Sequence, residues 1–135
     1  MSTTEQKAIV SRLVETVWNQ GEMDVVDELI ASDYVYYNPS MKMEVKGPEG
    51  YKSFVSVLRN AYSEIEVVVD DVIAEADRVV MCWSFQGKFQ DITKNSIPVT
   101  TTGVTVHRIQ NGKIVEEHSM HDALGLLQQL GVISI

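Results

Sequence analysis

Histidine and acidic side chains gather near the end of the chain, at His107, Glu116, His118 and Asp122. Imidazole and carboxylate groups are the side chains that most often donate and accept protons near neutral pH. If these four residues share one surface, that surface could carry general acid/base chemistry. Whether they share it depends on the strands that hold them.

A β-hairpin is predicted at Asn111-Gly112, because both residues tolerate the positive φ that a two-residue turn needs and apolar and polar residues alternate on either side. Such a short loop fixes the register of the two strands. The expected pairs are Gln110 with Lys113, Ile109 with Ile114, His107 with Glu116, and Thr105 with His118.

This register sorts the hairpin side chains onto two faces, since successive strand residues point to opposite sides. The first face mixes apolar residues with histidine and carboxylate, which suits the wall of a half-polar cavity better than a dry core or a solvated surface. Its expected members are Thr105, His107, Ile109, Ile114, Glu116, His118 and Met120. The other face would carry Val104, Val106, Arg108, Val115, Glu117 and Ser119.

Asp122 continues the parity of the first face just before ALGLLQQL, where leucines recur at helical spacing. It could be a catalytic base, whose pKa burial would raise, or the N-cap of the last helix, whose carboxylate backbone N–H groups would hold ionised. In a fully extended strand His118 and Asp122 would lie roughly 13 Å apart. We therefore expect His118, with His107, to donate hydrogen bonds to a substrate oxygen rather than to pair with Asp122.

Further pocket candidates lie on two earlier strands. Tyr34, Tyr36 and Asn38 share one strand face in DYVYYNP, and Tyr36 and Asn38 could bind a substrate oxygen or belong to a packed aromatic strand and its turn. Trp83, with Met81 and Phe85, is expected to line the pocket or enter the core. Met120 is expected to contact substrate from the first face. No metal site is expected, because His118 and His121 would face opposite ways in a strand.

Composition limits the function classes. A chain of 135 residues with 44% hydrophobic content should form one domain, residues 1–135, with room for a core and a pocket. A formal charge of -8 argues against nucleic acid or an anionic membrane as partner. The single cysteine, Cys82, suits a reducing compartment, and the N-terminus lacks a signal sequence, so we expect a cytoplasmic protein.

The elements expected before the hairpin are three helices and three strands. A capping box at Thr3 and Gln6 opens a helix that Gly21 ends. A second helix covers about Asp24 to Ala31, and Gly47-Pro48 opens a third. Strands are expected in DYVYYNP, over Ile65 to Ala74 and over Val79 to Phe89, and Gln90 to Pro98 should form a loop over the pocket mouth.

Three stretches together resemble the SnoaL-like polyketide cyclases of the NTF2-like superfamily, which includes ketosteroid isomerase and limonene epoxide hydrolase. They are VWNQGEMDVVDELIASDYVYYNP, GPEGYKSFVSVLRNAY, and GKIVEEH followed by HDALGLLQQLG. The resemblance implies an α+β fold: a cone-shaped barrel in which three N-terminal helices pack on a strongly curved antiparallel sheet and enclose a pocket. It also implies a homodimer through the outer sheet face.

The resemblance further implies cofactor-free aldol ring closure with a late Asp as acid/base, a position that Asp122 matches. Two residues depart from the family pattern: His118 stands where Trp is typical, and Phe89 where His is typical. We expect a lyase or isomerase acting on a small apolar carbonyl substrate, without a cofactor. The alternative is a non-catalytic protein that binds a small molecule in the same pocket. Epoxide hydrolysis is less favoured, because Arg108 lies on the other sheet face.

Overall fold

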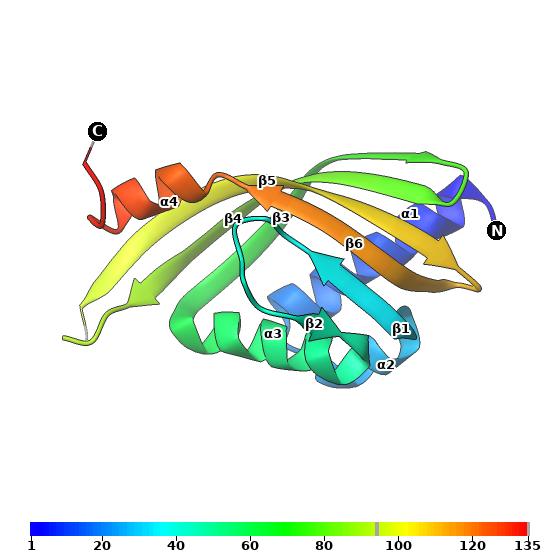
Figure 1. The fold of residues 1–135 in the computed structure, drawn as a ribbon, viewed down its shortest axis with the longest axis horizontal. Helices are drawn as coiled ribbons and strands as arrows, with labels where there is room; N and C mark the ends of the chain where they lie inside the picture. The colour runs from blue at the N-terminus through cyan, green and yellow to red at the C-terminus, as the bar shows by residue number, and fades with distance from the viewer. Residues whose placement is uncertain (94, 135) are drawn as a thin grey trace.

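The computed structural model describes residues 1–93 and 95–134, which form a curved six-stranded sheet with the helices of residues 3–61 on its concave side (Figure 1). The sheet order is β2-β1-β6-β5-β4-β3. The strands are β1 (Ile30–Tyr37), β2 (Val45–Lys46), β3 (Tyr62–Glu75), β4 (Arg78–Gln90), β5 (Ser96–Gln110) and β6 (Lys113–His121). The helices are α1 (Thr3–Arg12), the π-helix η1 (Leu13–Asn19), the 3-10 helix η2 (Met23–Val25), α2 (Val26–Leu29), α3 (Gly47–Ala61) and α4 (Ala123–Gln129).

The sheet is mixed rather than wholly antiparallel. Strands β3 to β6 form the expected antiparallel series, but β1 runs parallel to β6, with Tyr36 beside Glu117 and Tyr37 beside His118. The period of two shows which way side chains face and says nothing about strand direction. The alternation that predicted the strands therefore could not predict that β1 and β6 run parallel.

The first helix begins one residue earlier than expected. Ser2, not Thr3, is the N-cap, and its hydroxyl accepts a hydrogen bond from the Glu5 N–H. The helix continues into the π-turn of η1, and Gly21 with φ of +74° ends it. At the end of η1 the Asn19 amide bonds both backbone groups of Val67 on the edge strand β3, at 2.9 and 2.7 Å. This contact fixes η1 against the sheet.

The second predicted helix is shorter than Asp24 to Ala31. A 3-10 turn leads into the single turn of α2, and Ile30 is already extended. Ile30 is β-branched and completely buried, so packing in the sheet outweighs its helical spacing. The third helix is confirmed: Pro48 lies in the first turn of α3, and Tyr51, Phe54 and Val55 are buried.

The hairpin at Asn111-Gly112 is confirmed, but its register changes after two pairs. Gln110 lies opposite Lys113 and Ile109 opposite Ile114, as expected, whereas Arg108 lies opposite Glu116. Val115 is thus the extra residue of a β-bulge, which shifts all later pairs by one. The observed later pairs are His107 with Glu117, Val106 with His118, Thr105 with Ser119, Val104 with Met120, and Gly103 with His121.

The bulge reverses the predicted faces of β6. Glu117 and Ser119 are buried on the concave side, whereas Met120 is 65% exposed. The assignment of Glu116, His118 and Met120 to the cavity face was therefore wrong, and so was the outer placement of Glu117 and Ser119. Because the side-chain period is two, one inserted residue is enough to exchange the faces.

The β3–β4 hairpin is confirmed, and the predicted loop from Gln90 to Pro98 is shorter than expected. Gln90 pairs with Ser96, and Lys88 pairs with Pro98 across the β4–β5 ladder. The Asp91 carboxylate closes the turn by accepting the N–H groups of Thr93 and Asn95. Lys94, also within that predicted loop, lies outside the described residues. None of the helices in the described part of the chain has the length and apolar character needed to cross a membrane.

Candidate active site

A cavity of about 160 Å³ lies between the concave sheet face and the helices. This is the size that a single aromatic ring fills. Its lining is mostly apolar and aromatic, and Glu117 is the only acidic residue among the described lining residues. The lining residues are Leu13, Val14, Trp18, Tyr36, Asn38, Met41, Tyr51, Phe54, Leu58, Tyr62, Val67, Met81, Trp83, Phe85, Thr101, Thr105, His107, Glu117, Ser119, His121 and Leu126.

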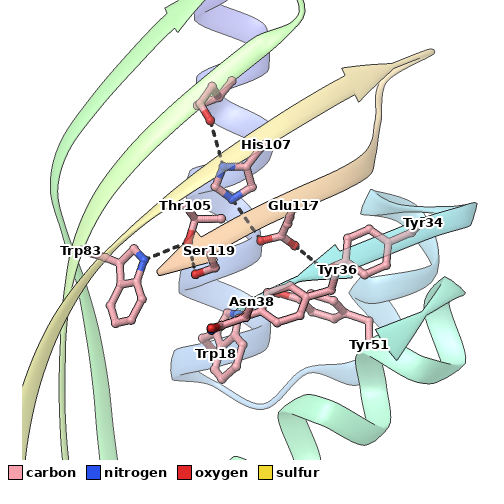
Figure 2. Close-up of polar contacts among 11 residues, drawn as sticks. Trp18, Tyr34, Tyr36, Asn38, Tyr51, Trp83, Thr105, His107, Glu117 and Ser119 are labelled. Atoms are coloured by element: carbon pink, nitrogen blue, oxygen red, sulfur yellow. Dashed lines mark hydrogen bonds and ion pairs between the residues drawn. The ribbon is translucent and has the colours of Figure 1, made fainter. Parts of the chain in front are cut away.

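Aromatic rings from three elements form one wall of the cavity. The ring centroids of Trp18 in η1 and Phe54 in α3 lie 5.7 Å apart in an edge-to-face arrangement. The ring centroid of Tyr36 in β1 lies 5.0 Å from that of Phe54. The indole N–H of Trp18 donates to the Tyr51 hydroxyl at 2.8 Å (Figure 2). Edge-to-face rings lock one another in place, so this wall gives the cavity a fixed shape.

Glu117 and His107 form a buried pair on neighbouring strands (Figure 2). Glu117 is 6% exposed and His107 is 1% exposed. The Glu117 Oε2 lies 3.4 Å from His107 Nε2, and Oε1 accepts a hydrogen bond from the Tyr34 hydroxyl at 2.9 Å. A carboxylate this deep is tolerated only where such partners replace water.

The partners of His107 determine how many protons the pair holds. Its Nδ1 lies 3.1 Å from the Val79 carbonyl oxygen, which can only accept, so Nδ1 carries a hydrogen. A bare Nε2 facing a bare carboxylate oxygen would set two lone pairs against each other. At least one further proton therefore lies between His107 and Glu117, on the ring or on the carboxyl group.

The tyrosines beside Glu117 respond to its charge and to burial. Burial first, and then the Glu117 charge, raises the pKa of both Tyr34 and Tyr51 well above the usual tyrosine range. Burial also raises the pKa of Tyr36, while hydrogen bonds from Asn38 and Ser119 oppose that rise. All three hydroxyls are therefore neutral groups that can donate a hydrogen bond at neutral pH.

A second row of polar groups lies one step along the same strands. The indole N–H of Trp83 donates to Thr105 Oγ1 at 2.9 Å, and that hydroxyl lies 2.9 Å from the Ser119 hydroxyl. Gly103 makes room for the indole ring, since a Cβ there would lie 2.2 Å from Trp83 Cζ2. Trp83 is thus fixed across Gly103 as part of the cavity wall.

Asn38 links two further lining residues, Tyr36 and His121. Its Oδ1 accepts the Ser40 N–H at 2.9 Å, and its Nδ2 lies 3.1 Å from the Tyr36 hydroxyl and 3.4 Å from His121 Nδ1. The cavity therefore has three polar groups of residues, around Glu117, Thr105 and Asn38. Within residues 1–93 and 95–134, no three His, Cys, Asp or Glu side chains lie close enough together to hold a metal ion.

The sequence profile of the SnoaL-like polyketide cyclases matches residues 8–130, almost the whole chain. The chain belongs to the SnoaL-like polyketide cyclase family. Solved structures similar to this SnoaL-like chain have the same fold. A candidate polyketide cyclase from Acidithiobacillus ferrooxidans is 26% identical, with 99% of this chain and all of that one covered and a TM-score of 0.82.

Two further similar structures have the same fold. A candidate SnoaL-like polyketide cyclase from Jannaschia sp. CCS1 is 24% identical over 98% of this chain and 95% of that one, with a TM-score of 0.83. AclR, a candidate hydroxylase from Streptomyces galilaeus, is 23% identical over 98% of this chain and all of that one, with a TM-score of 0.84. No curated protein sequence matches this SnoaL-like chain.

Four of the predicted site residues line the cavity of this SnoaL-like protein and three lie elsewhere. His107, Asn38, Tyr36 and Trp83 line it, as do Tyr51 and Phe54 of α3. The other three, Asp122, His118 and Met120, are exposed.

Asp122 is the N-cap of α4, and its carboxylate accepts the Gly125 N–H at 2.9 Å. This is the capping geometry that the sequence left open beside catalysis. His118 lies on the outer sheet face, where its ring stacks on Tyr37 and its Nε2 lies 2.8 Å from Glu116. Asp122 and His118 both lie outside the described cavity lining. The catalytic roles expected for them remain predictions.

Glu117, Ser119 and His121 are lining residues of β6 that sequence reasoning missed. All three follow the bulge at Val115, so a single register error displaced them together. A signal was present in the sequence: Ile114 and Val115 are consecutive apolar residues in a strand that otherwise is mostly polar. Both are buried, which a regular strand with one solvated face would not allow.

Proposed function

We propose that this SnoaL-like protein is a cofactor-independent lyase or isomerase that transfers a proton within a small, mostly apolar carbonyl compound. With a second carbonyl in the same ligand, the transfer would start an intramolecular aldol ring closure, as in polyketide ester cyclases. The observation that supports this proposal is the buried Glu117–His107 pair in an apolar cavity. A carboxylate in such surroundings is a suitable general base.

In the proposed reaction His107 holds the further proton of the pair, and the Glu117 carboxylate removes a proton from the carbon beside a carbonyl group, so that the electron pair becomes an enolate. The enolate carbon then attacks a second carbonyl carbon of the same molecule, which forms the ring bond and leaves an alkoxide. The proton on Glu117 returns to that oxygen, so atoms and charge balance. His107 and Tyr34 hold the carboxylate in place by contacting one oxygen each.

The shape of the cavity would decide which ring forms. The aromatic wall of Trp18, Tyr36 and Phe54 leaves a narrow apolar space beside Glu117. Holding the two reacting carbons in contact removes most of the entropic cost of ring closure. No covalent enzyme intermediate is needed for this chemistry.

Proton exchange tests the proposal and distinguishes the two candidate bases. We expect the protein to accelerate deuterium uptake by ethyl 2-methylacetoacetate in D₂O, measured by NMR against buffer alone. Glu117→Gln keeps the shape of the side chain but cannot accept the proton, so the acceleration should fall by about 10²- to 10⁴-fold. Asp122→Asn, an equally conservative change at the α4 N-cap, should leave the acceleration unchanged.

The other possible outcomes of the exchange experiment also assign or reject a base. Loss of exchange in Asp122→Asn with retention in Glu117→Gln would assign the base to Asp122, as the family resemblance implies. His118→Gln, on the outer face, serves as the matched histidine control and should exchange normally. If the unaltered protein does not exceed the buffer rate, the catalytic proposal fails.

One observation favours the second candidate, a non-catalytic protein that binds a small apolar molecule. Both oxygens of Glu117 already have partners, as they would in a structural polar network. In that case an apolar ligand should raise the melting temperature of the protein and be recovered chemically unchanged after prolonged incubation.

A further inference from the structure

The hydrogen-bond partners of Asn38 fix the orientation of its side-chain amide. The Ser40 N–H can only donate, and it lies 2.9 Å from the oxygen that it bonds. That atom is therefore Oδ1, and the other terminal atom is the nitrogen, which carries two hydrogens. Asn38 lies at the cavity with 9% of its surface exposed, so these hydrogens must find acceptors within the protein.

The two Nδ2 contacts of Asn38 then determine the roles of its neighbours. One hydrogen goes to the Tyr36 hydroxyl oxygen at 3.1 Å and the other to His121 Nδ1 at 3.4 Å. His121 Nδ1 must accept, so a neutral His121 carries its proton on Nε2. The Tyr36 oxygen accepts as well, which leaves its own hydrogen free to donate to a different group.

We infer that Tyr36 and His121 form a two-donor site for one ligand oxygen that becomes negatively charged, such as an enolate or phenolate oxygen. Both residues line the cavity, and Tyr36 lies beside Glu117 in the β1–β6 ladder. Two N–H or O–H donors aimed at one position stabilise charge that develops there.

The inference extends the proposed function and rests on it for the identity of the ligand. When Glu117 takes a proton from the ligand, the carboxyl becomes neutral and the negative charge moves to the ligand oxygen. The total charge inside the cavity does not change, so the transfer needs no counterion from solvent. The expected ligand is thus an enolisable carbonyl compound whose carbonyl oxygen lies between Tyr36 and His121.

Binding of 4-nitrophenol tests the site without requiring turnover. The probe has one ring, which suits the cavity volume, and its absorbance shifts when it ionises. At a pH at which free 4-nitrophenol is mostly neutral, we expect the bound probe to absorb as the phenolate. Tyr36→Phe removes one charge-assisted hydrogen bond and should weaken binding by at least about tenfold. His121→Leu should weaken it similarly.

Two further variants separate this role from a structural one. Tyr37→Phe removes the neighbouring hydroxyl, which lies on the outer face with 47% of the residue exposed, and should bind the probe normally. Asn38→Asp retains the side-chain shape but offers an acceptor to the Tyr36 hydrogen. It should therefore weaken phenolate binding although Tyr36 and His121 are both present. Urea unfolding of each variant checks that the fold is intact.

The inference fails if the bound probe absorbs as neutral phenol, if Tyr36→Phe binds as well as the unaltered protein, or if no saturable binding is found. These results are independent of the base assignment. Phenolate binding that depends on Tyr36, with deuterium exchange unaffected by Glu117→Gln, would support the two-donor site and reject Glu117 as the base. Deuterium exchange that is lost in Glu117→Gln, with phenolate binding unaffected by Tyr36→Phe, would support Glu117 as the base and reject the two-donor site.

Discussion

Tyr34 and Tyr51 are buried acids whose pKa values control the alkaline stability of the protein. Burial, reinforced by the Glu117 charge, raises the pKa of both hydroxyls in the folded state, whereas in the unfolded chain they ionise near 10.0. Both states hold these protons below pH 10, so the contribution to stability is fully present there. Above pH 10 the unfolded chain loses the protons and the folded protein retains them, so the contribution is lost as pH rises.

The free energy of unfolding should therefore decrease above pH 10 by about 1.4 kcal/mol per pH unit for each tyrosine. Urea unfolding between pH 9 and pH 11 measures that slope. Tyr34→Phe and Tyr51→Phe should each flatten it, whatever they do to stability at neutral pH. Tyr37→Phe, at an exposed position, should leave the slope unchanged. An equal slope in all three variants would contradict this account.

At the level of elements, the predictions that succeeded rest on local signals. The turn at Asn111-Gly112 and the helix after Gly47-Pro48 were correctly predicted because turn and capping chemistry lies within a few residues. The family resemblance supplied the curved α+β barrel, which the sheet and helices confirm. The parallel β1–β6 pair joins residues about eighty positions apart, and no local pattern records such a contact.

The candidate site was predicted in part for the same reason. His107, Tyr36 and Asn38 face the cavity as expected, because the pairing is regular from Val35 to Tyr37 in β1 and around His107 in β5. Glu117 and His121 were missed because Val115 adds one residue to β6. A bulge needs only one extra residue, yet it exchanges the sheet faces of all later residues in the strand. Apolar/polar alternation alone therefore assigns those residues to the wrong face.

Deleting Val115 should show how much depends on this bulge. Without the extra residue Glu116 directly follows Ile114, so the strand becomes regular and the later pairs, His107 with Glu117 among them, keep their register. Val115→Ala keeps the register and should cost about 1.5–3 kcal/mol, the burial energy of the side chain. The deletion leaves Glu117 opposite His107, so it should cost about as much as Val115→Ala. Urea unfolding of both variants compares the two losses. A loss about 3–5 kcal/mol larger for the deletion would show that Glu117 leaves His107 and would contradict this assignment of the bulge.

For the whole molecule, we expect a homodimer through the outer face of the sheet. Val104 and Met120 are direct cross-strand partners there and are 42% and 65% exposed. Val106 belongs to the same face, whereas Val115, also expected there, is buried by the bulge. Exposed apolar neighbours of this kind are typical of contact surfaces.

Light scattering at micromolar concentration should report twice the mass of the 15.1 kDa chain. Val104→Lys should shift the protein towards monomer, because a buried ammonium group is costly to desolvate. Val57→Lys provides a matched control, since Val57 is 55% exposed on α3, on the helical side. A monomeric unaltered protein would remove the homodimer from consideration.

The position of β6 between β1 and β5 also has a consequence for synthesis on the ribosome. The strand that completes the sheet is the last one made, so β1 and β5 keep unpaired edges until residue 121 has emerged. Open strand edges are templates for association with other chains. The nascent chain is therefore open to association through both edges until β6 pairs and completes the sheet.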